Sequence, residues 1–170
     1  MIVVGGGAAG IFAAITCAEA APHAQVTVLE KGARFLSKVR ISGGGRCNVT
    51  HHCFEARELA ARFPRGAQEL IGPFQQFQAR ETVQWFESRG VKLKTESDGR
   101  MFPVTDSSET VIACLLQTAH AAGVTLLANH GVEAVRKHSD GRFIVNTSEG
   151  GERVCDKLLL ATGGCRTPAL

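Results

Sequence analysis

Two short apolar runs with an alanine-rich segment between them open the chain. Residues 2–4 form a β-branched run suited to a fully buried strand, and residues 26–29 form a second apolar run. Residues 8–21, between them, are rich in alanine, which favours a helix that packs on the first strand. The pattern therefore predicts a βαβ unit that starts at the first residues of the chain.

The middle of the chain changes character. Residues 31–48 have no clear period and contain four glycines, so they are predicted to form a long structured loop. Helical patterns follow at residues 55–62, 67–77 and 79–88. Short strands are expected at residues 91–93 and 100–102, on either side of the turn Asp98-Gly99.

The last third returns to alternating helix and strand. Asp106 and Glu109 have the spacing of a capping box, which predicts a helix that runs to about Ala122. Apolar strands are expected at residues 124–127 and 158–160, with a hairpin of residues 131–137 and 142–147 between them. A chain of 170 residues suits one domain, residues 1–170, of the α/β class with a parallel sheet and crossover helices.

The turn after the first strand carries the clearest chemical signal. Gly5-Gly6-Gly7-Ala8-Ala9-Gly10 fits the pattern G-x-G-x-x-G. Gly5 would allow a tight turn, Gly7 would let the backbone approach a pyrophosphate, and Gly10 would let helix and strand pack closely. The amides and the dipole of the helix start, at Ala8 and Ala9, favour phosphate charge.

An acidic residue completes this pattern. Glu30 stands at the end of the second strand, about 20 residues after the last glycine, where a carboxylate accepts hydrogen bonds from ribose hydroxyls. The same carboxylate would repel a 2′-phosphate, so NADP is disfavoured at this site. The turn and Glu30 together predict a binding site for the ADP half of a dinucleotide, with FAD and NAD both open at this point.

The order of the later elements resembles the flavoproteins with two dinucleotide-binding domains that are related to glutathione reductase. This resemblance implies a Rossmann-like FAD-binding domain in which a β-meander crosses the sheet. It also implies that Val132 contacts the adenine through its backbone, and that Ala161, Thr162 and Gly163 come near the cofactor.

A second glycine-rich segment narrows the family. Residues 41–48 read Ile-Ser-Gly-Gly-Gly-Arg-Cys-Asn, and such a loop offers backbone amides and polar side chains to an anion or a ring edge. Together with Glu30-Lys31, Lys38 and the later segment of residues 98–103, it resembles the bacterial aminoacetone-oxidase-like flavoproteins, also described as BaiN-like or YhiN-like. The resemblance covers essentially all 170 residues.

The resemblance implies roles for this loop. Residues 38–48 would pass along the FAD toward its flavin, with Lys38 placing a positive charge near the pyrimidine side. Arg46 and Asn48 would form hydrogen bonds to the cofactor, and Ser42, Gly43 and Gly44 would line it. Lys31 and Cys47 complete the candidate cofactor-binding residues, although Cys47 is better explained as a packed cysteine because it has no C-x-x-C partner.

The family also continues beyond the Ala-Thr-Gly-Gly turn with an inserted domain and a C-terminal return to the FAD domain. We therefore expect this chain to be the N-terminal portion of an FAD-dependent oxidoreductase, with NAD(P)H as a candidate external electron donor and a small-molecule substrate. The sequence assigns no catalytic residue. An NAD-binding dehydrogenase domain and a non-catalytic dinucleotide-binding module are the competing interpretations.

Composition excludes several other classes. The chain has 44% hydrophobic and 21% charged residues and a net charge of +3, with Lys and Arg scattered, so neither disorder nor nucleic-acid binding is indicated. No apolar run is long enough for a membrane span, and the six cysteines suit reduced thiols in a cytoplasmic protein. Cys47, His51, His52 and Cys53 lack the paired spacings of zinc sites, so no metal is expected.

Overall fold

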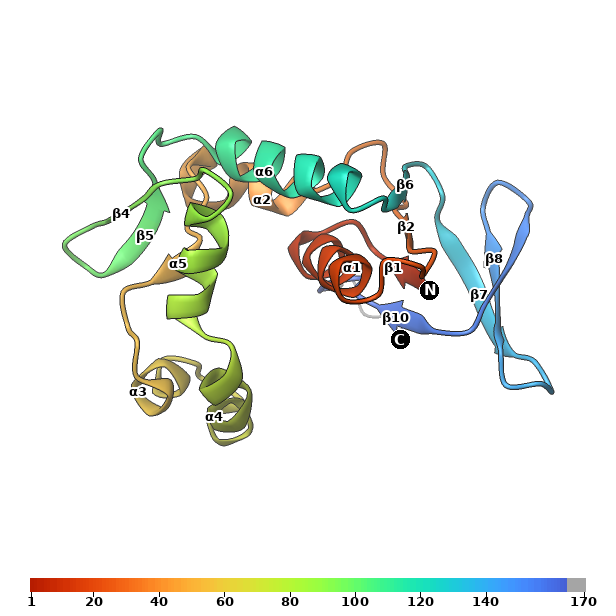
Figure 1. Cartoon of the computed structure of the whole chain (residues 1–170), viewed down its shortest axis with the longest axis horizontal. Coiled ribbons are helices and arrows are strands. Elements are labelled where there is room, and N and C mark those ends of the chain that lie inside the picture. The colour runs from red at the N-terminus through yellow and green to blue at the C-terminus, as the bar shows by residue number, and fades with distance from the viewer. Residues whose placement is uncertain (165–170) are drawn as a thin grey trace. The chain divides into compact units, whose positions relative to one another are not determined.

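A computed structural model describes residues 1–164 (Figure 1). Contacts between Cα atoms divide the chain into two compact units. The first unit contains residues 1–39 and the chain from residue 115 onward, and the second contains residues 40–114.

A four-stranded parallel sheet forms the centre of the first unit. Its strand order is β10-β1-β2-β6, with β10 at Leu158–Leu160, β1 at Ile2–Val4, β2 at Thr27–Leu29 and β6 at Thr125–Leu127. Val3 of β1 lies opposite Val28 of β2, and both side chains are fully buried. The predicted parallel sheet is confirmed, and its strand residues are apolar apart from Thr27 and Thr125.

Helix α1, Ala8–Ala20, covers this sheet and connects β1 to β2. Its buried residues are Gly10, Ile11, Ala14, Ile15 and Ala18. They follow the helical spacing of three or four residues, and the small ones let the helix axis approach the strands. The predicted βαβ unit is therefore present.

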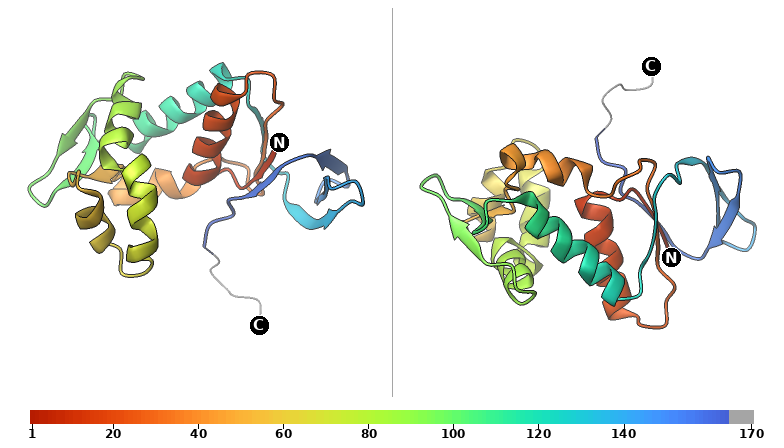
Figure 2. Two further views of the ribbon diagram at one scale, coloured as in Figure 1. Left: turned by 60° about the horizontal axis from the view of Figure 1, so that its bottom comes forward. Right: turned by 90° about the horizontal axis from the view of Figure 1, so that it is seen from above.

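A separate antiparallel sheet forms the β-meander of the first unit. Its strands are β7 at Val132–Lys137, β8 at Phe143–Thr147 and β9 at Glu152–Cys155, in the order β7-β8-β9. Both views of Figure 2 show β7 and β8 side by side. Val145 and Cys155 of the meander pack in one apolar cluster with Ile2, Val4 and Leu29 of the parallel sheet. The predicted hairpin is confirmed, and β9 extends it to the three strands of a meander.

The second unit combines helices with a small antiparallel sheet. Its helices are α3 at Ala56–Ala61, α4 at Ala67–Gln76 and α5 at Ala79–Glu87. Its sheet has the order β3-β5-β4, with β3 at Thr50–His51, β5 at Arg100–Pro103 and β4 at Leu93–Thr95. Phe102 on the central strand is fully buried and anchors this unit.

Two local predictions differ from the structure. The region expected to be loop contains a short helix α2, Ser37–Ile41, and a 3-10 turn, Ser42–Gly45, because glycines in left-handed conformations let the chain coil without an apolar period. Helix α6, Ser108–Ala121, does not start with the predicted capping box. The Glu109 amide donates to Ser107 Oγ at 3.3 Å, while the carboxylate of Asp106 pairs with Lys94.

Candidate dinucleotide-binding site

The first glycine turn is tightly packed at both of its ends. Gly5 has a φ of +108°, and a Cβ there would lie 2.4 Å from the carbonyl oxygen of Ala161. A Cβ on Gly10 would lie 1.9 Å from the carbonyl oxygen of Gly5. Neither position accepts a side chain, because the nearest atoms belong to the backbone. The roles predicted for Gly5 and Gly10 in turn and packing agree with this geometry.

Gly7 differs from its neighbours because nothing crowds it. No heavy atom lies within 4 Å of a Cβ built on Gly7, and its φ of −81° suits any residue. Gly7 precedes α1, and Ala8 and Ala9 form the exposed first turn of that helix. The helix start thus presents backbone amides and a positive dipole end toward open space, which suits an anionic group.

Glu30 is fixed by the backbone at the carboxyl end of β2. Its Oε2 accepts a hydrogen bond from the Gly6 amide at 2.7 Å, and its Oε1 accepts one from the Gly32 amide at 2.7 Å. Each carboxylate oxygen can accept more than one hydrogen bond, so capacity for hydroxyl donors remains. The two amides fix the direction in which Glu30 presents its carboxylate.

One cavity joins these features. It has a volume of about 340 Å³ and lies at the carboxyl ends of β1, β2 and β10, where open parallel sheets bind ligands. Among the predicted cofactor-binding residues, the cavity is lined by Gly5, Gly7, Ala8, Ala9, Glu30, Lys38, Ala161, Thr162 and Gly163. The structure thus brings together residues that are up to 158 positions apart in the chain, from Gly5 to Gly163.

Four further lining residues were not among the predicted ones: Gly6, Leu36, Ser37 and Val39. The Leu36 amide donates to the carbonyl oxygen of Gly6 at 2.8 Å, and Leu36 is buried with a φ of +59°. A Cβ on Gly6 would lie 2.3 Å from Cδ1 of Phe35. The run of three glycines could have indicated that Gly6 lines the cavity. Nothing in the sequence indicates that Leu36 adopts a left-handed backbone.

Lys38 lies beside the late glycine turn. Its Nζ donates to the carbonyl oxygen of Gly164 at 3.4 Å, and a Cβ on Gly163 would lie 3.5 Å from this Nζ. Lys38 therefore brings one positive charge to the wall of the cavity. This placement is compatible with the expected role of Lys38 near an anionic cofactor, and that role stays a prediction.

Gly10, Lys31 and Val132 belong to the first unit without lining the cavity. Gly10 packs against the carbonyl oxygen of Gly5. The Lys31 side chain packs near Gly131, and its Cγ lies 3.3 Å from a Cβ built on Gly131. Val132 starts β7 and packs against the apolar cluster between the sheets. The proposed contact of the Val132 backbone with adenine stays a prediction.

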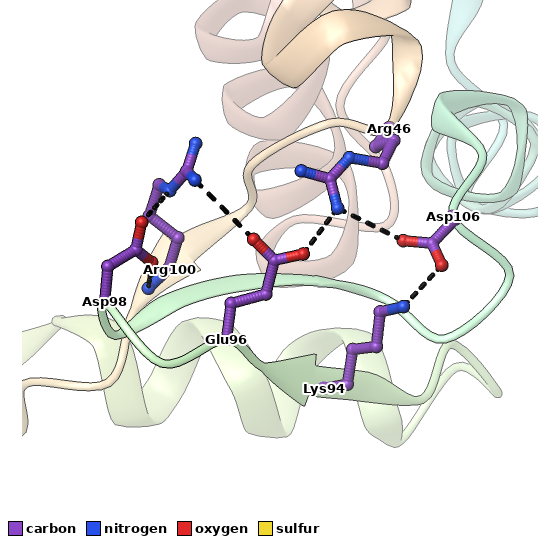
Figure 3. A network of polar contacts seen from close by, with 6 residues as sticks. All are labelled: Arg46, Lys94, Glu96, Asp98, Arg100 and Asp106. Atoms are coloured by element: carbon purple, nitrogen blue, oxygen red, sulfur yellow. Dashed lines mark hydrogen bonds and ion pairs between the residues drawn. The ribbon is translucent and has the colours of Figure 1, made fainter.

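Ser42, Gly43, Gly44, Arg46, Cys47 and Asn48 belong to the second unit. Gly43 lies against Phe102, and Arg46 forms ion pairs with Glu96 and Asp106 (Figure 3). Cys47 is 6% exposed, and burial raises the pKa of its thiol, which favours the interpretation as a packed cysteine. Contacts of these residues with a cofactor stay predictions.

Comparison with known proteins identifies the family of this chain. The model of the HI0933-like protein Rossmann domain matches residues 1–170. The chain belongs to the HI0933-like family. The resemblance to BaiN-like and YhiN-like flavoproteins that was inferred from the glycine-rich segments is thereby confirmed.

Two curated relatives have been given different names. The chain is 30% identical over 168 residues to the 3-dehydro-bile acid delta(4,6)-reductase of Clostridium scindens, covering 99% of this chain and 40% of that protein. It is 28% identical over 169 residues to the ribosomal RNA dihydrouridine synthase of Escherichia coli, again covering 99% of this chain and 40% of that protein. The chain thus spans about 40% of the length of the curated relatives it matches.

Solved structures support the fold. The 3-ketosteroid-delta4-(5alpha)-dehydrogenase of Rhodococcus jostii RHA1 superposes with a TM-score of 0.67 at 16% identity, covering 95% of this chain and 45% of that one. THI4 of Thermovibrio ammonificans gives a TM-score of 0.63 at 13% identity, covering 95% of this chain and 55% of that one. At these identities the likeness concerns the Rossmann-like fold, which confirms the predicted fold class.

Within residues 1–164, no helix is both long and apolar enough to cross a membrane. The same part of the chain contains no group of three or more His, Cys, Asp or Glu side chains arranged to hold a metal ion.

Proposed function

We propose that this chain is the FAD-binding lobe of a flavin-dependent oxidoreductase. The observation that carries the proposal is the cavity at the carboxyl ends of the parallel strands, where Gly7 is open while Gly5 and Gly10 are crowded by backbone. A turn that served only packing would have no reason to leave its middle glycine without neighbours. An approaching pyrophosphate supplies that reason.

The residues of the cavity fit the ADP half of FAD. The amides at the start of α1 would hold the pyrophosphate, and the Glu30 carboxylate would accept hydrogen bonds from the ribose hydroxyls. Lys38 would add a positive charge beside the late glycine turn. When bound, FAD supplies the hydride chemistry, and the protein supplies binding, orientation and electrostatics.

Family membership favours FAD over NAD as the resident cofactor. The name of one relative describes a reductase, and the name of the other describes formation of a dihydro base, so both names imply the addition of hydrogen to the substrate. A resident flavin that hydrogenates a substrate must be reduced again by an external donor. We assign that role to a nicotinamide dinucleotide, which would bind elsewhere because FAD occupies this cavity.

For the substrate we propose a small molecule. Lys and Arg are spread along the chain with a net charge of +3, without the basic tract that nucleic-acid binding favours. The relative named after ribosomal RNA makes RNA the competing substrate. Salt-dependent binding of unmodified ribosomal RNA by the protein, with a steep slope, would favour RNA instead.

We also propose a location in the reducing cytoplasm, because Cys17, Cys47, Cys53 and Cys155 form no disulfide.

Cofactor content tests the proposal directly. We expect the protein at its full natural length to purify with visible flavin absorbance, or to take up added FAD with quenching of flavin fluorescence. A Glu30→Ala variant should lose FAD, while Glu152→Ala, which removes an exposed carboxylate on β9, should retain it. Tight binding of NAD by a protein that takes up no FAD would favour the dehydrogenase interpretation and contradict ours.

A further inference from the structure

The second glycine-rich segment forms a single left-handed turn. Gly43, Gly44 and Gly45 have φ values of +56°, +69° and +88°, Arg46 returns to −94°, and Cys47 has +62°. The turn is closed by the Cys47 amide, which donates to the carbonyl oxygen of Ser42 at 3.0 Å. Glycine adopts these dihedral angles freely but has many other conformations available, so contacts with the rest of the unit must select this one.

Those contacts concern the two ends of the turn rather than its middle. A Cβ on Gly43 would lie 2.8 Å from Cε1 of Phe102, so one end rests on the buried ring. No heavy atom lies within 4 Å of a Cβ built on Gly44 or Gly45. The middle of the turn therefore faces open space, and Arg46 stands at its exit.

The Arg46 side chain contacts Phe102, Glu96 and Asp106, all within the second unit, and Figure 3 shows the contacts with the two carboxylates. Its guanidinium carbon lies 4.0 Å from the centroid of the Phe102 ring. Its Nη1 donates to Glu96 Oε1 at 2.5 Å and lies 3.5 Å from Asp106 Oδ1. The hydrogen bond to Glu96 raises the pKa of Arg46 further above its usual value, so the guanidinium stays charged.

The two carboxylates are in turn fixed by other cations. Arg100 Nη2 lies 3.6 Å from Glu96 Oε2, and Lys94 forms an ion pair with Asp106. Asp98 balances Arg100 through a contact of 2.7 Å to its Nε. The network in Figure 3 therefore joins three cations and three anions and carries no net charge.

The neutral charge of this network distinguishes two possible roles of Arg46, which are binding the cofactor and holding the turn. A residue that binds a cofactor phosphate or a flavin oxygen needs donors and charge directed at the ligand. The Arg46 guanidinium instead stacks on Phe102, and its charge is neutralised by Glu96 and Asp106. Moving it to a ligand would break its hydrogen bond to Glu96 Oε1 and leave this half-buried carboxylate with only the 3.6 Å contact to Arg100, which costs free energy.

Building on the proposed function, we propose that Arg46 is a positioning residue: through Glu96, Asp106 and Phe102 it holds the Gly43–Gly45 turn, which the family resemblance predicts to line the cofactor, and it does not bind the cofactor itself. This replaces the direct hydrogen bond to FAD that the family resemblance implied for Arg46.

A double-mutant cycle in the full-length protein separates the two roles. The variants are Arg46→Gln, Glu96→Gln and the pair combined, with Arg136→Gln as the matched control. Arg136 pairs with Glu152 at 2.7 Å on the exposed meander, outside the network. Each variant is measured for FAD dissociation constant and, without cofactor, for amide hydrogen exchange of residues 43–47.

A positioning role predicts that both single variants weaken FAD binding by similar factors, about tenfold, and that the double variant is no weaker than the worse single one. Exchange of the turn amides in the apoprotein should be faster in all three variants. Arg136→Gln should change neither measurement. Asp106→Asn, which removes the longer of the two Arg46 ion pairs together with the ion pair to Lys94, should show the same changes to a smaller extent.

A direct cofactor contact predicts a different pattern and would overturn the proposal. Arg46→Gln would then weaken binding, while Glu96→Gln would leave it unchanged or strengthen it, and turn exchange in the apoprotein would not move. Should the Gln variants fail to fold, Asp106→Asn and its exchange data decide the question. Wild-type protein that takes up no FAD would refute the proposed function, whereas the exchange data would still show whether Arg46 holds the turn.

Discussion

Alanine at Gly10 and alanine at Gly7 should have opposite consequences, although the two residues share one turn. At Gly10 the new Cβ would lie 1.9 Å from the carbonyl oxygen of Gly5 and 3.3 Å from a methyl of Val3. The strand and the helix must separate, because neither neighbour can rotate away. Overpacking of this kind costs about 3 kcal/mol, which the helix propensity of alanine offsets by about 1 kcal/mol.

The expected net loss is therefore about 2 kcal/mol, which corresponds to a fall in the melting temperature of about 4–8 °C for a domain of this size. At Gly7 the backbone already has dihedral angles that alanine adopts, and nothing lies within 4 Å of the new Cβ. The free energy of unfolding should change by less than about 0.5 kcal/mol. FAD binding should weaken by at least about tenfold, since the methyl group keeps the pyrophosphate away from the amides.

Thermal unfolding of the apoprotein and FAD titration measure the two effects separately. Gly72→Ala provides the control, because Gly72 lies in α4 and a Cβ there has no neighbour within 4 Å. The assignment of Gly10 to packing and Gly7 to the ligand is refuted by either of two results. One is a Gly7→Ala protein that binds FAD like wild type, and the other is a Gly7→Ala protein as unstable as Gly10→Ala.

Three further outcomes follow from the described contacts. Glu30→Gln should lower the free energy of unfolding by about 1–3 kcal/mol in urea titrations, because two backbone amides share one remaining acceptor oxygen; an unchanged midpoint would contradict this. The hydrogen bond from Lys94 holds the pKa of Asp106 below its usual value, so its stabilising effect is present above about pH 4 and is lost as pH falls through the lower folded-state pKa. The difference in melting temperature between wild type and Asp106→Asn should therefore shrink on acidification, and a constant difference would argue against the pairing. Burial raises the pKa of Cys47, so alkylation followed by mass spectrometry should modify the half-buried Cys17 before Cys47, and the reverse order would contradict the packed position of Cys47.

Local signals in the sequence were enough to predict the cofactor end of the fold. Gly5 and Gly10 lie where no side chain fits, and Glu30 directly follows a short apolar strand. The spacing of these residues in the sequence was therefore enough to predict the turn and the carboxylate beside it. The parallel strands could also be predicted from the sequence, since each is a short run of mainly aliphatic residues.

Other parts of the structure depend on tertiary contacts that a linear pattern does not contain. Leu36 adopts a left-handed backbone because its amide reaches Gly6, and leucine gives no hint of this. Asp106 had the spacing of a helix cap, yet its carboxylate pairs with Lys94 and Arg46, and Ser107 takes the capping role. The partners of Arg46 lie 50 and 60 positions further along the chain, and only the folded β4–β5 region brings them together.

The pairing of β1 with β10 determines when the site can form. Val3 of the first strand lies opposite Leu159 of the last described strand, and the Ala161 oxygen that crowds Gly5 comes directly after it. During synthesis, at about 5–20 residues per second, the first strand would wait roughly 10–30 s for this partner. Until then the cavity beside the glycine turn lacks the wall that Ala161, Thr162 and Gly163 supply, and the edge of β1 is unpaired. The wall that Ala161, Thr162 and Gly163 supply is therefore the last part of the cavity to form, and its formation depends on a pairing between strands far apart in the sequence, which is slow.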